Sequence, residues 1–368
     1  MNRNNDQISS AQLAFTLAIT MIGIGILSMP RTLVEKVGPD ALFVVLGGIV
    51  IVVVLAFIIS KLVTKFPKEG IVEFGNTLLG KFLGTVMALG LFAHFIFFTA
   101  IEVRMFGEII KTYLLLHTPL EVLMISYLLT VVVVVRGGIE PFARMSQILF
   151  PIILISSAMA ILPMIGELDF THFLPVFRTP VLDLVKALPL MIFSFLGLEL
   201  ILLFSAFVKD TKNIAKNVMF SAGFTGLIYF VTVAVTIARF GLVETTHMIW
   251  PGLEIYKTID IPGAFIENIQ IYVLASWILS VLMTTVGVYY GASLTLSRII
   301  KSPEQGFLAV LMLPVIYYLA LMPDGLLQTL EFMDLFSNYL GTLYLVLVPI
   351  VLLGMSLFIK KKGGSKSE

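Results

Sequence analysis

The sequence predicts an all-α polytopic membrane protein that crosses the bilayer about ten times and forms a single transmembrane domain (1–368). Of its 368 residues, 58% are hydrophobic and only 13% are charged, and the mean hydropathy is +1.03. A soluble domain would carry roughly a quarter charged residues, so most of this surface must face lipid. Ten apolar stretches reach the about 20 residues that a spanning helix needs, which leaves no room for a sizeable soluble domain.

The apolar stretches and the basic residues between them predict the topology. We place the helices at residues 10–33, 39–63, 82–115, 119–136, 142–165, 181–208, 217–240, 265–298, 306–322 and 337–359. With the N-terminus inside, sixteen Lys and Arg residues fall in inside segments and seven in outside segments. Because basic residues are enriched in cytoplasmic loops, we expect both termini to be cytoplasmic.

Two of these helices carry a sequence that interrupts a helix. The first contains Gly23-Ile-Gly-Ile-Leu-Ser-Met-Pro30, and the sixth contains Pro189 followed by Phe193-Ser-Phe-Leu-Gly-Leu-Glu199. Gly and Pro weaken a helix, and broken backbone at membrane depth is tolerated where it is buried in protein or lines a cavity. The breaks occupy matching places in two sets of five helices (about 10–165 and 181–360). The pattern predicts a 5+5 inverted repeat, in which paired discontinuous helices mark a substrate site.

A broken helix exposes backbone groups that a small ligand can bind. Its N–H groups and positive dipole end suit a carboxylate, and its freed carbonyl oxygens suit an ammonium group. The two breaks together suit a zwitterionic amino acid, although a small neutral or anionic solute is also compatible. The alternative is that these glycines serve only close packing of membrane helices.

Polar side chains in the third, sixth and eighth helices are further candidates. His94, Phe98 and Glu102 share one helix face, and Arg104 follows; the group forms either a binding wall or proton-sensitive element, or an ion pair that fixes packing. Glu199 either carries a proton, caps the interrupted helix or binds the first break. In the eighth helix a hydroxyl stripe (Thr285, Tyr289, Ser293) faces a ligand or bonds to its own backbone.

Enzymatic and nucleic-acid functions find no support in the sequence. It contains no His-Glu-x-x-His, no nucleophile elbow and no phosphate-cradling Gly-rich loop with Lys. The four histidines are scattered, and cysteine is absent, which excludes thiolate metal sites. The formal net charge is +1. We therefore expect no catalysis, no metal, no cofactor and no nucleic-acid partner.

Taken together, these motifs resemble the B-type, permease-like subunits of spore germinant receptors, the GerAB family of the amino acid–polyamine–organocation superfamily. The resemblance extends from Gln12 to Lys362. It depends on the order and spacing of six segments: Gly23 to Arg31, Glu102-Val-Arg104, Arg136-Gly-Gly138, Ser194 to Glu199, Ile249-Trp-Pro251 and Tyr339-Leu-Gly341.

The resemblance implies a LeuT-like fold, a ligand site and a cellular setting. The ligand site would be formed by Gly23, Ile24, Gly25, His94, Phe98, Leu196, Gly197, Thr285 and Tyr289, with Glu102, Arg104 and Glu199 in coupling or gating. By the same similarity, the chain would lie in the inner spore membrane or the cell membrane. Its partners would be an A-type membrane subunit and a C-type lipoprotein subunit, and its ligand a small nutrient, an amino acid above all.

Two functions remain open from the sequence. In the first, the chain is the nutrient-sensing subunit of a germination receptor, and ligand binding shifts a conformational equilibrium. In the second, it is a proton-coupled amino-acid transporter that acts alone, with Glu102 or Glu199 as proton carrier. Both use the same site, so no motif decides between them.

Overall fold

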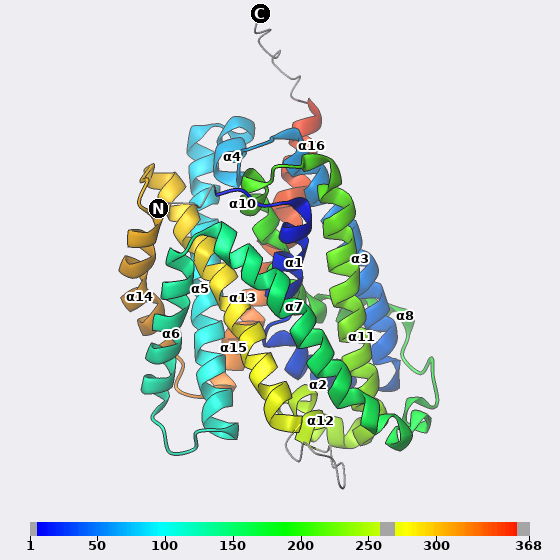
Figure 1. Cartoon of the computed structure of the whole chain (residues 1–368). Helices are drawn as coiled ribbons and strands as arrows, with labels where there is room; N and C mark the ends of the chain where they lie inside the picture. The colour runs from blue at the N-terminus through cyan, green and yellow to red at the C-terminus, as the bar shows by residue number, and fades with distance from the viewer. Residues whose placement is uncertain (1–5, 258–268, 359–368) are drawn as a thin grey trace, which may run out of the picture.

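The computed structural model describes residues 6–257 and 269–358, and these residues are almost entirely helical (Figure 1). The described part contains no β-strand, only an isolated bridge between Ile8 and Val208. The α-helices are α1 (Ser10–Met21), α2 (Gly25–Val37), α3 (Ala41–Lys65), α4 (Ile71–Leu79), α5 (Lys81–Tyr113), α6 (Leu120–Arg136), α7 (Ile139–Ile161), α8 (Val181–Ala187), α9 (Ile192–Phe195), α10 (Ile201–Phe204), α11 (Ile214–His247), α12 (Pro251–Lys257), α13 (Ile269–Ile300), α14 (Gln305–Leu321), α15 (Leu326–Phe336) and α16 (Val348–Phe358).

The helices have the length and composition of membrane spans. Among the described residues, six helical segments are long and apolar enough to cross a bilayer, and Val181–Phe195 with Leu198–Phe207 adds a seventh if this pair, bent by 57°, is one span. Two shorter apolar helices, α1 and α14, accompany them. Large apolar side chains such as Phe220 and Val133 are each 71% exposed, as expected where lipid replaces water. These observations confirm an all-helical, polytopic membrane protein.

The two halves of the first predicted span lie inside the bundle. In Figure 1, α1 and α2 occupy the middle of the molecule, and α1 packs against α7, α11 and α13. Residues 38–40 form a 3-10 turn, after which α3 begins. The burial of α1 is nearly complete from Leu17 to Met21. The backbone that follows Met21 is therefore enclosed by protein, the condition under which an interrupted helix is tolerated at membrane depth.

Side chains fix the N-terminal segment against the end of the sixth predicted span. Ile8 exchanges backbone hydrogen bonds with Phe207 and Lys209. The carboxylate of Asp210 accepts hydrogen bonds from the Ser10 amide (2.7 Å) and hydroxyl (2.6 Å). Burial raises the pKa of Asp210, but these hydrogen bonds lower it more, so that the pKa lies below its ordinary value.

The amphipathic segment after α3 forms the short helix α4, which packs on α5 (Figure 1). The Glu73 carboxylate accepts the amide hydrogen of Gly70 at 2.8 Å, which satisfies a free donor at the helix start. The same carboxylate pairs with Arg298 at 2.6 Å. An ion pair therefore joins α4 to the end of α13.

Several observed helices begin or end away from the predicted ranges. The largest difference is in the tenth span, which was predicted from residue 337, whereas α15 begins at Leu326. The predicted start of the eighth span at residue 265 lies outside the described residues. The seventh span was expected to end at residue 240, and the backbone does leave the helical conformation at Gly241, whose φ is +72° and ψ 178°; a second helical segment then runs to His247. Glycine tolerates this backbone angle and so allows the chain to turn there. The tenth predicted span contains π-helical turns at Ser337–Gly341 and Leu343–Leu347 between α15 and α16. Its last predicted residue and the end of the second repeat at 360 lie outside the described residues.

Candidate functional site

The first span breaks where the glycines predicted. Helix α1 ends at Met21 and α2 begins at Gly25, which leaves Ile22, Gly23 and Ile24 outside both helices. The Ser280 hydroxyl of α13 donates to the freed Ile22 carbonyl at 2.6 Å. The Ile24 amide is hydrogen-bonded to the Glu102 carboxylate of α5. Neighbouring helices thus satisfy one acceptor and one donor that the break releases.

The second break lies between α9 and α10. Leu196 is extended and Gly197 has a φ of +106°, a region that favours glycine. A Cβ atom on Gly197 would also come within 3.0 Å of the Thr20 carbonyl oxygen in α1, so the two breaks lie side by side. The Gly197 amide donates to Glu199 Oε2 at 2.8 Å. Glu199 therefore caps the backbone of the second break at Gly197.

Helix α5 contacts both breaks with the face formed by His94, Phe98 and Glu102. His94 Nε2 is hydrogen-bonded to Glu199 Oε1 at 3.0 Å, and both side chains are fully buried. The ring of Phe98 packs edge-on against Phe193 of α9, with the centroids 5.7 Å apart. Two buried atoms, His94 Nδ1 and Glu102 Oε2, have no hydrogen-bond partner among the described residues. A buried polar atom of this kind is costly and is a candidate contact for a ligand.

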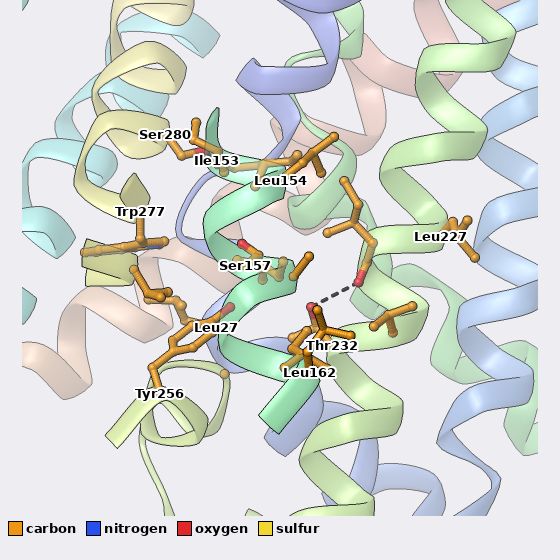
Figure 2. Close-up of a pocket in the computed structure, with 18 residues that line it drawn as sticks. Leu27, Ile153, Leu154, Ser157, Leu162, Leu227, Thr232, Tyr256, Trp277 and Ser280 are labelled. Carbon is orange, nitrogen blue, oxygen red and sulfur yellow. Dashed lines mark hydrogen bonds between the residues drawn. The ribbon is translucent and has the colours of Figure 1, made fainter. Parts of the chain in front are cut away.

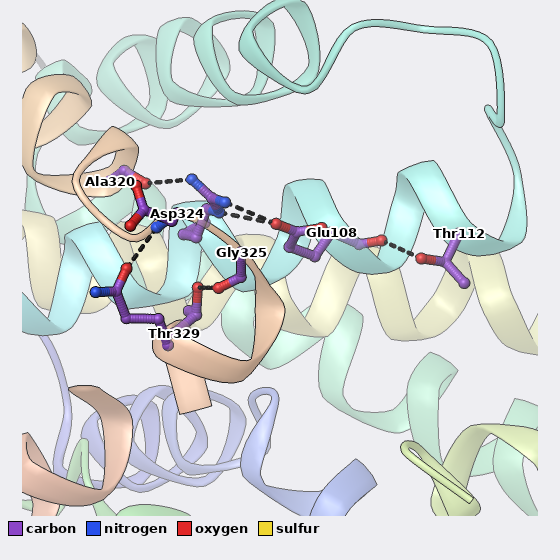
Figure 3. Close-up of polar contacts among 8 residues, drawn as sticks. Glu108, Thr112, Ala320, Asp324, Gly325 and Thr329 are labelled. Carbon is purple, nitrogen blue, oxygen red and sulfur yellow. Dashed lines mark hydrogen bonds and ion pairs between the residues drawn. The ribbon is translucent and has the colours of Figure 1, made fainter. Parts of the chain in front are cut away.

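Arg104, on the same helix, lies in a separate polar network with Glu108 and Ala320, which Figure 3 labels. Its guanidinium pairs with Glu108 at 2.9 Å and donates to the Ala320 carbonyl at 3.3 Å. The alternative of a Glu102–Arg104 ion pair is not what forms, because side chains two residues apart point in different directions on a helix. Arg104 instead joins α5 to the end of α14.

The structure brings together some of the predicted residues and places others elsewhere. Gly23, Ile24, Gly25, His94, Phe98, Glu102, Leu196, Gly197 and Glu199 surround the two breaks. Thr285 is hydrogen-bonded to Tyr127 of α6 at 2.7 Å, and Tyr289 donates to the Ala309 carbonyl of α14 at 2.5 Å. These two residues therefore lie on a face of α13 that packs against α6 and α14.

Three residues at the breaks were not singled out from the sequence. On α13, Ser280 contacts Ile22, and the Thr284 hydroxyl donates to the Ile19 carbonyl at 3.3 Å. On α11, the Tyr229 hydroxyl lies close to carbonyls of both breaks. Ser280 and Thr284 have the same four-residue spacing as Thr285 and Tyr289, and this spacing is the sequence signal that could have identified Ser280 and Thr284.

Several cavities among the described residues lie beside the broken helices, and two of them adjoin the first break. A polar cavity of about 100 Å³ is lined by Gly25 and Ser28 of α2, Ser194 of α9 and residues of α15. An apolar cavity of about 320 Å³ lies between α2, α7, α11, α12 and α13, with Ile22 and Ser280 in its wall (Figure 2). Figure 2 shows its labelled side chains, among them Trp277, converging from these helices. Among the described residues, no group of three or more His, Asp or Glu side chains could hold a metal ion.

Comparison with known proteins identifies the family. The profile of the spore germination protein family matches residues 7–328. Spore germination protein YndE of Bacillus subtilis (strain 168) is 29% identical over 96% of this chain and 98% of its own length. GerLB of Bacillus cereus, also a spore germination protein, is 26% identical over 99% and 98%, and spore germination protein B2 of Bacillus subtilis (strain 168) is 25% identical over 95% of both chains. The chain therefore belongs to the spore germination protein family.

Proposed function

We propose that this chain is the nutrient-sensing, permease-like subunit of a germination receptor, and that a small amino acid or similar nutrient binds at the two breaks. The observation that carries the proposal is the side-by-side position of the breaks, where Gly197 packs so closely on α1 that an added Cβ atom would lie 3.0 Å from the Thr20 carbonyl oxygen. The Met21 carbonyl oxygen of the first break and the Ser194 carbonyl oxygen of the second both lie within hydrogen-bonding distance of one point, the Tyr229 hydroxyl. Carbonyl oxygens complement an ammonium group, as helix N-terminal amides complement a carboxylate. Membership of the spore germination protein family supports the physiological role.

The proposed architecture has ten crossings in a 5+5 inverted, LeuT-like repeat. The crossings would be α1–α2, α3, α5, α6, α7, α8–α10, α11, α13, α14 and α15–α16, with both termini cytoplasmic. The discontinuous crossings are then the first of each set of five, as paired broken helices are in inverted-repeat transporters. The proposed partners are an A-type membrane subunit and a C-type lipoprotein subunit in the inner spore membrane. Co-purification of all three from spores would test that assembly.

A thermal-shift screen of the detergent-purified protein tests the ligand assignment. Each of the twenty amino acids is added in turn, and we expect at least one to raise the melting temperature, because a ligand that binds only the folded state stabilises it. Gly25→Leu should abolish this shift while the protein still inserts into membranes, since the side chain would project into the space beside Ser194. A Gly25→Leu protein that keeps the full shift would place the nutrient elsewhere.

A buried carboxylate favours a second candidate function. Glu102 is 1% exposed and its Oε2 has no partner among the described residues, which suits a group that takes up and releases a proton during transport. A proton-coupled transporter acting alone would accumulate labelled amino acid in liposomes when a proton gradient is imposed. Binding without accumulation would leave the receptor function, and accumulation that Glu102→Gln abolishes would favour the transporter.

A further inference from the structure

One hydroxyl group reaches both breaks at once. Tyr229 of α11 is fully buried, and its hydroxyl oxygen lies 2.5 Å from the carbonyl oxygen of Met21 and 2.6 Å from that of Ser194. Met21 is the last residue of α1, and Ser194 lies in the last turn before the second break. An uninterrupted helix would bond each carbonyl to an amide four residues later. The breaks therefore release the two acceptors that Tyr229 contacts.

The two contacts cannot both be complete hydrogen bonds. A tyrosine hydroxyl carries one proton, whereas both carbonyl oxygens are acceptors only. When the proton points to Met21, the oxygen of Ser194 faces a hydroxyl lone pair, and the reverse holds in the other orientation. Met21 also accepts the Gly23 amide hydrogen at 2.9 Å. The Tyr229 hydroxyl proton is thus shared between one carbonyl oxygen of each break.

We propose that Tyr229 is a positioning residue that couples the two broken helices and keeps them closed on each other when no nutrient is bound. A donor group of a ligand, such as an ammonium, competes with the hydroxyl for the same two carbonyls and releases the contact between α1 and α9. The nature of this competing group rests on the proposed function, whereas the coupling of the two breaks does not. Tyr229 lies on α11, which is an unbroken helix at this position, and it acts on both breaks through their backbone carbonyl oxygens.

The absence of cysteine from the chain makes the coupling measurable. In a Ser194→Cys protein the single thiol lies at a buried position, 3% exposed, in the wall of the polar cavity. Its rate of reaction with a maleimide, measured without any nutrient, reports how often the breaks separate. Adding Tyr229→Phe removes the hydroxyl but keeps the ring that packs against Phe195 at 5.3 Å. We expect the labelling rate to rise about two- to tenfold, the range for loss of one intramolecular hydrogen bond.

Tyr290→Phe is the matched control, since Tyr290 is equally buried and its hydroxyl contacts Gln305 and the Ile139 backbone, away from both breaks. It should leave the labelling rate unchanged. Equal rates in the Tyr229→Phe and Tyr290→Phe proteins would overturn the proposal. Where Tyr229→Phe does not fold, 3-fluorotyrosine at position 229 keeps the ring, makes the hydroxyl a stronger donor and should slow labelling; an unchanged rate would again refute the coupling.

These outcomes are independent of the nutrient. A protein that no amino acid stabilises would refute the proposed ligand, yet the effect of Tyr229→Phe on labelling would still stand. A stabilising amino acid together with an unchanged labelling rate would keep the proposed function and remove Tyr229 from it. If both hold, Tyr229→Phe should also lower the nutrient concentration that gives half-maximal stabilisation, because the closed state no longer competes.

Discussion

Replacing Gly25 with alanine tests how closely the two broken helices pack. A Cβ atom at this position would lie 3.0 Å from Ser194 Oγ, 3.1 Å from Phe193 Cδ1 and 3.1 Å from Ser194 Cα. The two side-chain atoms can rotate away, but Ser194 Cα belongs to the backbone of α9 and can move only if α2 and α9 separate. Overpacking of this kind typically costs about 1–3 kcal/mol. We therefore expect Gly25→Ala to lower the free energy of unfolding by about 1–3 kcal/mol.

Gly354→Ala provides the matched control, because nothing lies within 4 Å of the Cβ atom that it adds to α16. There the gain in helix propensity should raise stability by about 0.5–1 kcal/mol. Unfolding free energies measured in mixed micelles of mild detergent and dodecyl sulfate would compare the two proteins. If Gly25→Ala proves as stable as Gly354→Ala, α2 and α9 do not pack this closely, and the polar cavity beside Gly25 is wider than the structure shows.

Two further predictions concern acidic side chains: Asp210, which holds the N-terminal segment, and Glu199, which lies at the second break. Asp210 has a lowered pKa in the folded protein, so it stabilises the fold fully above about pH 4, the ordinary pKa of aspartate, and this contribution is lost as the pH falls through the folded value. Asp210→Asn should therefore weaken the pH dependence of unfolding below about pH 4, as measured by acid titration. His94→Phe keeps an aromatic ring beside Phe336 but leaves Glu199 buried without its partner, which should cost about 3 kcal/mol. Adding Glu199→Gln should restore part of that loss, whereas additive losses in the double mutant would contradict a direct coupling.

The position of both breaks could be predicted from the sequence because glycine and proline act locally. Gly23 is the middle one of the three residues that leave the helix, Gly25 begins α2, and Gly197 adopts a φ of +106°. That His94 and Glu102 share one helix face could also be predicted, since side chains at four-residue spacing lie above one another on a helix. These features depend on the periodicity of one helix and not on its neighbours.

The rotation of α13 could not be predicted from its own sequence. Two hydroxyl pairs with four-residue spacing, Ser280 with Thr284 and Thr285 with Tyr289, lie on faces of the helix that differ by about 100° for a one-residue offset. Only the packing against α1, α6 and α14 decides which pair meets the first break. The role of Tyr229 could not be predicted for the same reason, because the sequence around a lone tyrosine in an apolar helix does not indicate what its hydroxyl contacts.

The contacts at the breaks predict how a nutrient would gain affinity. Ser280 already holds the Ile22 carbonyl, and Glu102 holds the Ile24 amide. A ligand that binds these backbone groups exchanges one hydrogen bond for another, and the net gain from each exchange is small. Glu102 Oε2 differs, because it is buried without a partner among the described residues, and a donor that reaches it gains a bond without breaking one.

We therefore expect selectivity for ligands with an ammonium group to depend on Glu102. Glu102→Gln keeps the size of the side chain and its acceptor oxygen for Ile24 but cannot form the carboxylate with which an ammonium group would pair. It should weaken binding of an amino acid about tenfold or more, since hydrogen bonds to charged groups contribute about 1.5–3 kcal/mol. The matching hydroxy acid, which carries no ammonium, should lose much less. Competition between the two ligands in a thermal-shift titration measures the ratio, and an equal loss for both would show that the ammonium binds elsewhere.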